Sequence, residues 1–186
     1  MKKFIESKYA KDIINYHCPR YEEYPDIGFY MEQVVELLNK NLSVFRIDNR
    51  KYITSTMINN YVKQKIIEAP KNKKYSRNQI CWLFAIGILK QILNINELSY
   101  FVKISLNAYP IDVAFNFLCT ELENAIKAAF VTRDFSEPSS ASKDTEFSEA
   151  FRSALLSFTN KVYIAKFLQY NKDLEEEKKE SQMETQ

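Results

Sequence analysis

The sequence contains only two glycines in 186 residues, and this scarcity restricts the folds and sites that it can build. Sheet-rich folds need glycine in tight turns, and phosphate-cradling loops need it where the backbone closely approaches a ligand. Both kinds of structure are therefore disfavoured. Hydrophobic residues make up 46% of the chain and aromatic residues 14%, which is enough for a packed core. The abundance of Lys, Glu, Leu, Ile and Asn predicts helices joined by polar turns.

Residues that carry catalytic or metal chemistry are also scarce. His17 is the single histidine, and with Cys18 it forms the one His/Cys pair, which cannot supply the four ligands of a zinc site. No strand–turn–helix elbow presents a nucleophile beside a base. We therefore predict no enzymatic activity, no catalytic residue, no metal site and no cofactor. The three cysteines are interpreted as small buried apolar residues in a reducing compartment.

No hydrophobic run approaches the roughly 20 residues that a membrane span requires. The lysines at the N-terminus are not followed by a long apolar region, so the pattern does not predict a signal peptide. We expect a cytoplasmic protein without a membrane partner.

Hydrophobic periodicity and turn residues predict a mainly α-helical chain in four regions. These are an N-terminal helix and arm (1–28, with the helix over about Lys2–Tyr16), a central DNA-binding domain (29–105), C-terminal helices for dimerisation or sensing (110–171, with a linker at 134–146) and a disordered charged tail (172–186). Capping pairs predict helix starts at Ser76 and Asn94. Gly87, inside an apolar helix, predicts a close crossing of two helices.

Charge is unevenly distributed along the chain. The segment from Arg50 to Arg77 has eight basic residues and one acid, Glu68, so it carries +7. The total charge is +2, which leaves −5 for the rest of the chain. A single basic stretch on an otherwise acidic protein is typical of a localised polyanion-binding face, although it also fits a solvated surface.

The residues around this basic stretch fit a helix-turn-helix, which needs a small helix with an apolar underside and a polar outer face. The segment from Ile53 to Ile67 places Met57, Ile58, Tyr61 and Val62 inward, and it leaves Thr56, Asn59, Asn60 and Lys63 outward. Asparagine can pair with adenine through two hydrogen bonds, and lysine can hold phosphates. The predicted phosphate contacts are Lys71, Lys73, Lys74 and Arg77.

The run from Met57 to Ile67, followed by Pro70 and then Lys73-Lys74-Tyr75-Ser76, resembles the winged-helix head of mercury-resistance-type (MerR-like) transcriptional regulators. More closely, residues 30–102 resemble a bacterial family known as domain of unknown function 1836, and Thr56–Lys63 is the most specific part of that match. The MerR resemblance implies a winged helix-turn-helix head. Asn59 stands where such regulators usually have arginine, and Lys65 stands where they have a turn glycine.

These observations predict a bacterial transcriptional regulator that binds double-stranded DNA at a specific operator. We expect a homodimer, paired through the helix that carries Phe147, Phe151, Phe158 and Leu168, because paired heads read paired half-sites. The small-molecule effector is left open. The alternative hypothesis is a non-catalytic adaptor whose basic head binds an acidic protein partner.

Overall fold

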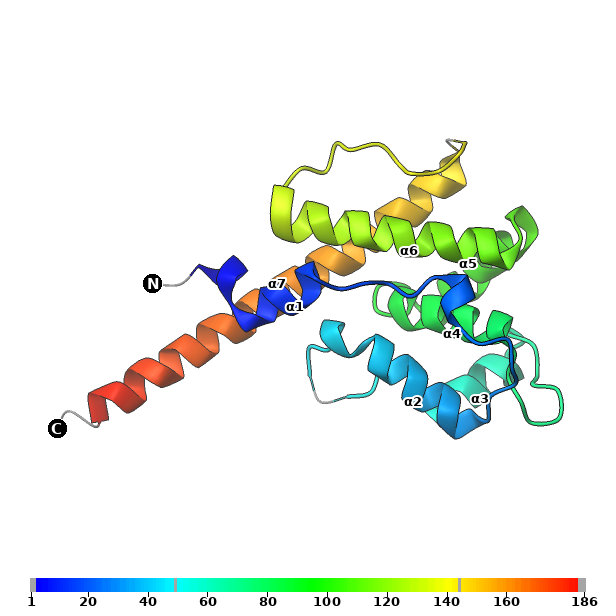
Figure 1. Cartoon of the computed structure of the whole chain (residues 1–186), viewed down its shortest axis with the longest axis horizontal. Coiled ribbons are helices and arrows are strands. Elements are labelled where there is room, and N and C mark those ends of the chain that lie inside the picture. The colour runs from blue at the N-terminus through cyan, green and yellow to red at the C-terminus, as the bar shows by residue number, and fades with distance from the viewer. Residues whose placement is uncertain (1–2, 49, 144, 184–186) are drawn as a thin grey trace.

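The computed structural model describes residues 3–48, 50–143 and 145–183, and this part of the chain is mainly helical (Figure 1). Its α-helices are α1 (Lys8–Ile14), α2 (Met31–Asn41), α3 (Ser55–Lys63), α4 (Arg77–Leu89), α5 (Ile95–Ala108), α6 (Ile111–Lys127) and α7 (Glu146–Met183). Shorter turns are η1 (Phe4–Glu6), η2 (Tyr21–Glu23), η3 (Ser43–Phe45) and the π-helical η4 (Ala128–Thr132). The described residues form no strand, only two isolated β-bridges. The predicted mainly α fold is confirmed.

Helix α4 is the central element, and it packs against α2, α6 and α7. Its start is fixed by the predicted capping box, in which the Ser76 amide donates to Gln79 Oε1 at 2.9 Å. From Ile80 to Leu89 its residues are apolar on every side and almost all buried, as expected for a helix surrounded by others. A Cβ atom at Gly87 would lie 2.8 Å from Leu42 Cδ1, so the predicted close crossing is confirmed.

Helix α7 runs along the whole molecule and packs on α6 and α4, and its C-terminal part projects beyond the other helices (Figure 1). Phe151 packs on Phe101 and Phe117, and Phe158 packs on Phe45. Both α7 residues are buried, at 7% and 1% exposure. The chain's own helices therefore cover Phe151 and Phe158, and the prediction that a second subunit covers these two residues is wrong, whereas Leu168 of the predicted stripe is exposed at 55%.

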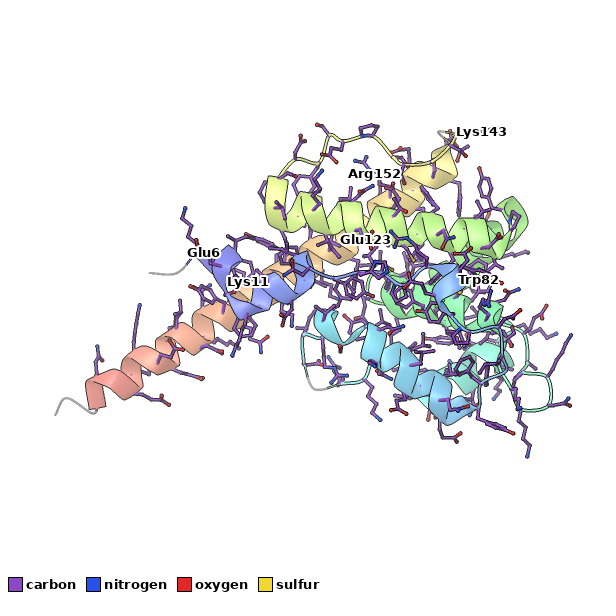
Figure 2. The ribbon with its side chains drawn as sticks, viewed as in Figure 1. Glu6, Lys11, Trp82, Glu123, Lys143 and Arg152 are labelled. Carbon is purple, nitrogen blue, oxygen red and sulfur yellow. The ribbon has the colours of Figure 1, made fainter. Side chains whose placement is uncertain are left out.

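The segment between α1 and α2, here called the arm (residues 15–30), crosses α6 and α4 on its way to the α2–α3 end (Figure 1). Arg20 Nη2 lies 2.6 Å from Glu123 Oε2, and the Cys18 amide donates to Glu123 Oε1 at 2.9 Å. Glu123 projects from α6 towards the arm in Figure 2. Burial opposes ionisation of Glu123, but the Arg20 and Cys18 hydrogen bonds hold its pKa below the usual value.

The segment between η4 and α7 contains no regular helix among its described residues, and it is attached to the helices beneath it. The Ser140 amide donates to the buried Glu121 at 2.7 Å, and the Arg152 guanidinium contacts the carbonyl groups of Phe135 and Glu137. Figure 2 shows Arg152 on α7 beneath this linker. One hydrophobic core extends from Phe4 to Val162, so it is continuous across the predicted region boundaries.

Two predicted regions differ in the structure. The first helix is split into η1 and α1, which ends at Ile14, and Lys2 lies outside the described residues. The tail predicted to be disordered from Lys172 continues α7 as far as Met183, and only residues 184–186 of that tail lie outside the described ranges. In the described part of the chain, no helix is both long enough and apolar enough to cross a bilayer.

Candidate nucleic-acid interface

Helix α3 is a short helix held by its apolar side. Its N-cap, Thr54, accepts a hydrogen bond from the Met57 amide at 3.2 Å, which satisfies one of the free donors at the helix start. Ile58 and Tyr61 are buried at 0% and 5% exposure. The interpretation of Tyr61 as a core residue is therefore confirmed, and the opposite side of α3 is left to solvent.

The outer face of α3 consists of Thr56, Asn59, Asn60 and Lys63, and all four are exposed. Their spacing of three and four residues places them on one side of the helix, as predicted. Asn60 Oδ1 accepts from Gln64 Nε2 at 3.3 Å, whereas the Asn59 amide has no hydrogen-bond partner among the described residues. Asn59 is therefore the freer of the two amides to meet a base edge.

The end of α3 uses a left-handed residue. Lys65 has a φ of 57°, the Lys65 amide donates to the Val62 carbonyl at 3.0 Å, and the Ile66 amide donates to the Tyr61 carbonyl at 2.9 Å. This pair of bonds is a Schellman motif, which normally has glycine at the left-handed position. Lys65 thus occupies the conformation that glycine would adopt more easily, and the chain turns sharply away from α3.

Residues 71–74 form a tight reversal, here called the basic turn. The Lys74 amide donates to the Lys71 carbonyl at 2.9 Å, and the central residues Asn72 and Lys73 have φ values of 51° and 63°. Positive φ at both central positions characterises the type I′ turn of β-hairpins, and asparagine tolerates it well. The sequence predicted a basic loop here, but it did not predict this turn type.

The basic turn is anchored to the end of the arm. Tyr75 is buried at 2% exposure and pairs with Phe29 through two backbone hydrogen bonds of 2.8 and 2.9 Å. Gly28 allows this approach, because a Cβ atom there would lie 2.8 Å from Lys74 Cβ. Lys74 Nζ lies 5.1 Å from the centre of the exposed Tyr30 ring, within range of a cation–π contact. Tyr30 is thus part of the site, although the sequence did not single it out.

Arg77 differs from the other predicted phosphate contacts. Its guanidinium carbon lies 5.0 Å from the centre of the Tyr21 ring, and its side chain is half-buried. Its Nε is buried and finds no hydrogen-bond partner among the described residues. Tyr21 in turn donates from its hydroxyl to Asn78 Oδ1 at 2.6 Å. These contacts place Arg77 against the arm rather than at the outer edge of the basic turn.

The remaining four predicted cations are exposed and unpaired. Within residues 3–48, 50–143 and 145–183, no carboxylate lies within ion-pairing distance of Lys63, Lys71, Lys73 or Lys74. Figure 1 places α3 and the chain that follows it at the same end of the molecule. Four unpaired lysines close together create a local positive field that attracts a polyanion.

A cavity of about 340 Å³ lies elsewhere, between α4, α5, α6 and α7. Its walls are mainly apolar and include Trp82, Val102 and Phe151. The α4 residues that line it lie on the side of that helix opposite Gly87, and therefore away from α2 and α3. It is not part of the candidate nucleic-acid interface.

All three cysteines are buried and free, as predicted for apolar core residues, and burial raises the pKa of the Cys18 and Cys81 thiols. In the described part of the chain, no group of three or more His, Cys, Asp or Glu side chains is arranged to hold a metal ion.

Comparison with known proteins identifies the family through the region that contains this site. No curated protein and no solved structure shows a significant match to the chain. The family described as "Domain of unknown function (DUF1836)" matches residues 19–116, just over half of the chain. The match includes most of the arm, α2 to α5, the basic turn and the start of α6. The chain therefore belongs to the DUF1836 family.

Proposed function

We propose that the chain is a DNA-binding transcriptional regulator that recognises a specific operator. In this proposal α2 and α3 form a helix-turn-helix of the MerR-like winged type, and the basic turn is its wing. The observation that carries the proposal is the combination of an outward polar face on α3 with four exposed, unpaired lysines on α3 and the basic turn.

Each part of this surface fits a different part of a duplex. The outer face of α3 is free of neighbouring elements, so Asn59 and Asn60 can reach base edges in a major groove. The basic turn is a compact reversal with its lysines exposed, so Lys73 and Lys74 can reach backbone phosphates or an adjacent minor groove. The positive φ residues fix where these lysines lie relative to α3.

The alternative, an adaptor that docks an acidic protein, would use the same lysines but would not need the asparagines. The two functions therefore differ in sequence selectivity. DNA fragments bound by the full chain can be selected from a random library and sequenced, with an excess of an acidic protein as competitor. Enrichment of one sequence motif among the bound fragments supports the regulator. Displacement of all DNA from the chain by the acidic protein supports the adaptor.

Alanine substitutions then distinguish contacts to base edges from contacts to backbone phosphates. Asn59→Ala should cost about 1–3 kcal/mol on the selected site and almost nothing on random DNA. Lys73→Ala should weaken both DNAs equally and reduce the salt slope by about one unit. If Asn59→Ala and Asn60→Ala both retain full discrimination while Lys73→Ala loses it, α3 is not the reading helix.

We also propose that the regulator is a homodimer. The buried phenylalanines of α7 cannot form the contact, but Ile164, Phe167 and Leu168 remain exposed at 59%, 43% and 55%. Their spacing of three and four residues places them on one face of α7, at the level where Phe167 also packs on Phe4 of η1 with ring centres 5.5 Å apart. Light scattering should show a dimer that Ile164→Glu with Leu168→Glu converts to a monomer. A monomeric wild-type chain at high concentration would contradict the proposal.

A further inference from the structure

A second cavity, of about 380 Å³, lies beside α3. Its walls come from four places: the connection before α3, α3 itself, the end of α4 and the middle of α7. The lining residues are Arg46, Ile47, Asp48, Arg50, Lys51, Tyr52, Met57, Lys90, Gln91 and Lys161. This cavity therefore joins segments that are distant in sequence, and it directly touches the helix that we propose reads DNA.

The charge of the lining is strongly positive. It contains five basic residues, Arg46, Arg50, Lys51, Lys90 and Lys161, and one acid, Asp48. The acid is already paired, because its Oδ2 lies 2.6 Å from Arg50 Nη2. The other four cations have no carboxylate within ion-pairing distance among the described residues. The lining thus holds an excess of positive charge that nothing in the described chain neutralises.

Two of these cations are partly withdrawn from water as well. Lys90 is half-buried, and the one hydrogen bond that its ammonium makes among the described residues goes to Met57 Sδ at 3.1 Å, which is a weak acceptor. Burial lowers the pKa of Lys90, because the charged form loses hydration without gaining a counter-ion. Arg46 Nε is buried and has no hydrogen-bond partner in the part of the chain that the structure describes. A half-buried ammonium without a counter-ion is costly, and an anion in the cavity would supply one to Lys90.

The cavity is beside the outer face of α3 and not in front of it. Successive residues of a helix are separated by about 100°, so Met57 leaves α3 roughly 110° away from the centre of the face formed by Thr56, Asn59, Asn60 and Lys63. A duplex docked on that face would therefore lie to one side of Lys90. This geometry favours a free small anion over a backbone phosphate as the occupant.

We infer that this cavity binds a small phosphorylated molecule. A volume of about 380 Å³ is in the range of small-molecule pockets. Arginine and lysine together suit phosphate, because the guanidinium offers a planar pair of donors and the ammonium a point charge. The phosphate would lie against Lys90 and Arg46, and it would reach Met57 on α3 from the inner side.

Calorimetry on the full chain tests the site, with pyrophosphate as the probe at constant ionic strength and no DNA present. Lys90→Met keeps an unbranched side chain of similar length but removes the charge and the hydrogen bond from Nζ to Met57. It should weaken pyrophosphate binding at least tenfold. Lys103→Met removes an exposed charge from α5, outside the cavity, and should leave the affinity within twofold. If Lys90→Met does not fold, Lys51→Met at the exposed rim should still weaken binding several-fold.

Three results would overturn the inference. The wild type does not bind pyrophosphate, Lys90→Met and Lys103→Met lose equal amounts of pyrophosphate affinity, or Lys90→Met weakens DNA binding but not pyrophosphate binding. In the last case the salt slope of DNA binding would fall by about one unit, and the cavity would hold a duplex phosphate. Because the calorimetry contains no DNA, its outcome is independent of whether the regulator proposal is correct.

Discussion

Replacing Lys65 by glycine should stabilise the protein. Lys65 has a φ of 57°, and a left-handed conformation costs a residue with a side chain about 1–2 kcal/mol. Glycine removes this cost but loses about 0.5–1 kcal/mol more in conformational entropy on folding. The difference is a gain of about 0.5–1 kcal/mol in the free energy of unfolding. With a typical urea m-value of about 2 kcal/mol/M, the unfolding midpoint should rise by about 0.2–0.5 M.

Lys63→Gly is the matched control, because it also removes one lysine from the same segment. Lys63 is the last residue of α3, where glycine costs up to about 1 kcal/mol, so its midpoint should fall by up to about 0.5 M. Urea titrations followed by circular dichroism at 222 nm compare the two variants with the wild type. If Lys65→Gly lowers the midpoint as much as Lys63→Gly, residue 65 is not left-handed and the described end of α3 is wrong.

Three further outcomes are expected. Glu123→Gln should lower the free energy of unfolding by about 2 kcal/mol at neutral pH, since Arg20 loses a charged acceptor. The pKa of Glu123 is held below its ordinary 4.5, so this stabilisation is present above that value and is lost as pH falls through the lower, folded-state pKa. Urea titrations from about pH 6 to pH 3 should therefore show the difference in unfolding free energy between the wild type and Glu123→Gln becoming smaller. Gly87→Val should lower the free energy of unfolding by about 1–3 kcal/mol, because the added methyl groups overpack the helix crossing. Gly87→Ala should leave thermal stability nearly unchanged, because the better helix propensity of alanine offsets the close contact with the flexible Leu42 side chain. Lys73→Gly should raise stability, because its φ is 63°, and should lower DNA affinity.

Local signals in the sequence predicted the helix starts and one packing contact. The capping pairs at Ser76 and Asn94 are observed, because such a pair is completed within four residues and needs no distant partner. Gly87 predicted a close crossing because glycine weakens the interior of a helix. That cost is offset when a neighbouring helix packs into the space left by the missing side chain. The outer face of α3 followed from its 3.6-residue period, which the helix geometry fixes directly.

Features that depend on distant partners could not be predicted. Phe158 packs on Phe45, more than 100 positions away, so its pattern alone could not distinguish core from subunit contact. The charged residues after Lys172 have the composition of a disordered tail, but they continue an existing helix, and extension costs far less than nucleation. The cavity at Lys90 likewise joins four separate segments, and no motif marks it.

The dependence of DNA affinity on salt concentration tests the proposed DNA binding most directly. The four exposed lysines at positions 63, 71, 73 and 74 should release about 0.9 counterion each, so the logarithm of affinity should fall with the logarithm of salt at a slope of about −4 per chain. Changing Lys71, Lys73 and Lys74 to glutamine should reduce the slope to about −1. The same change at residues 172, 178 and 179 on the projecting part of α7 removes equal charge and should leave the slope unchanged. A wild-type slope near zero, or equal effects of the two triple variants, would contradict DNA binding through α3 and the basic turn.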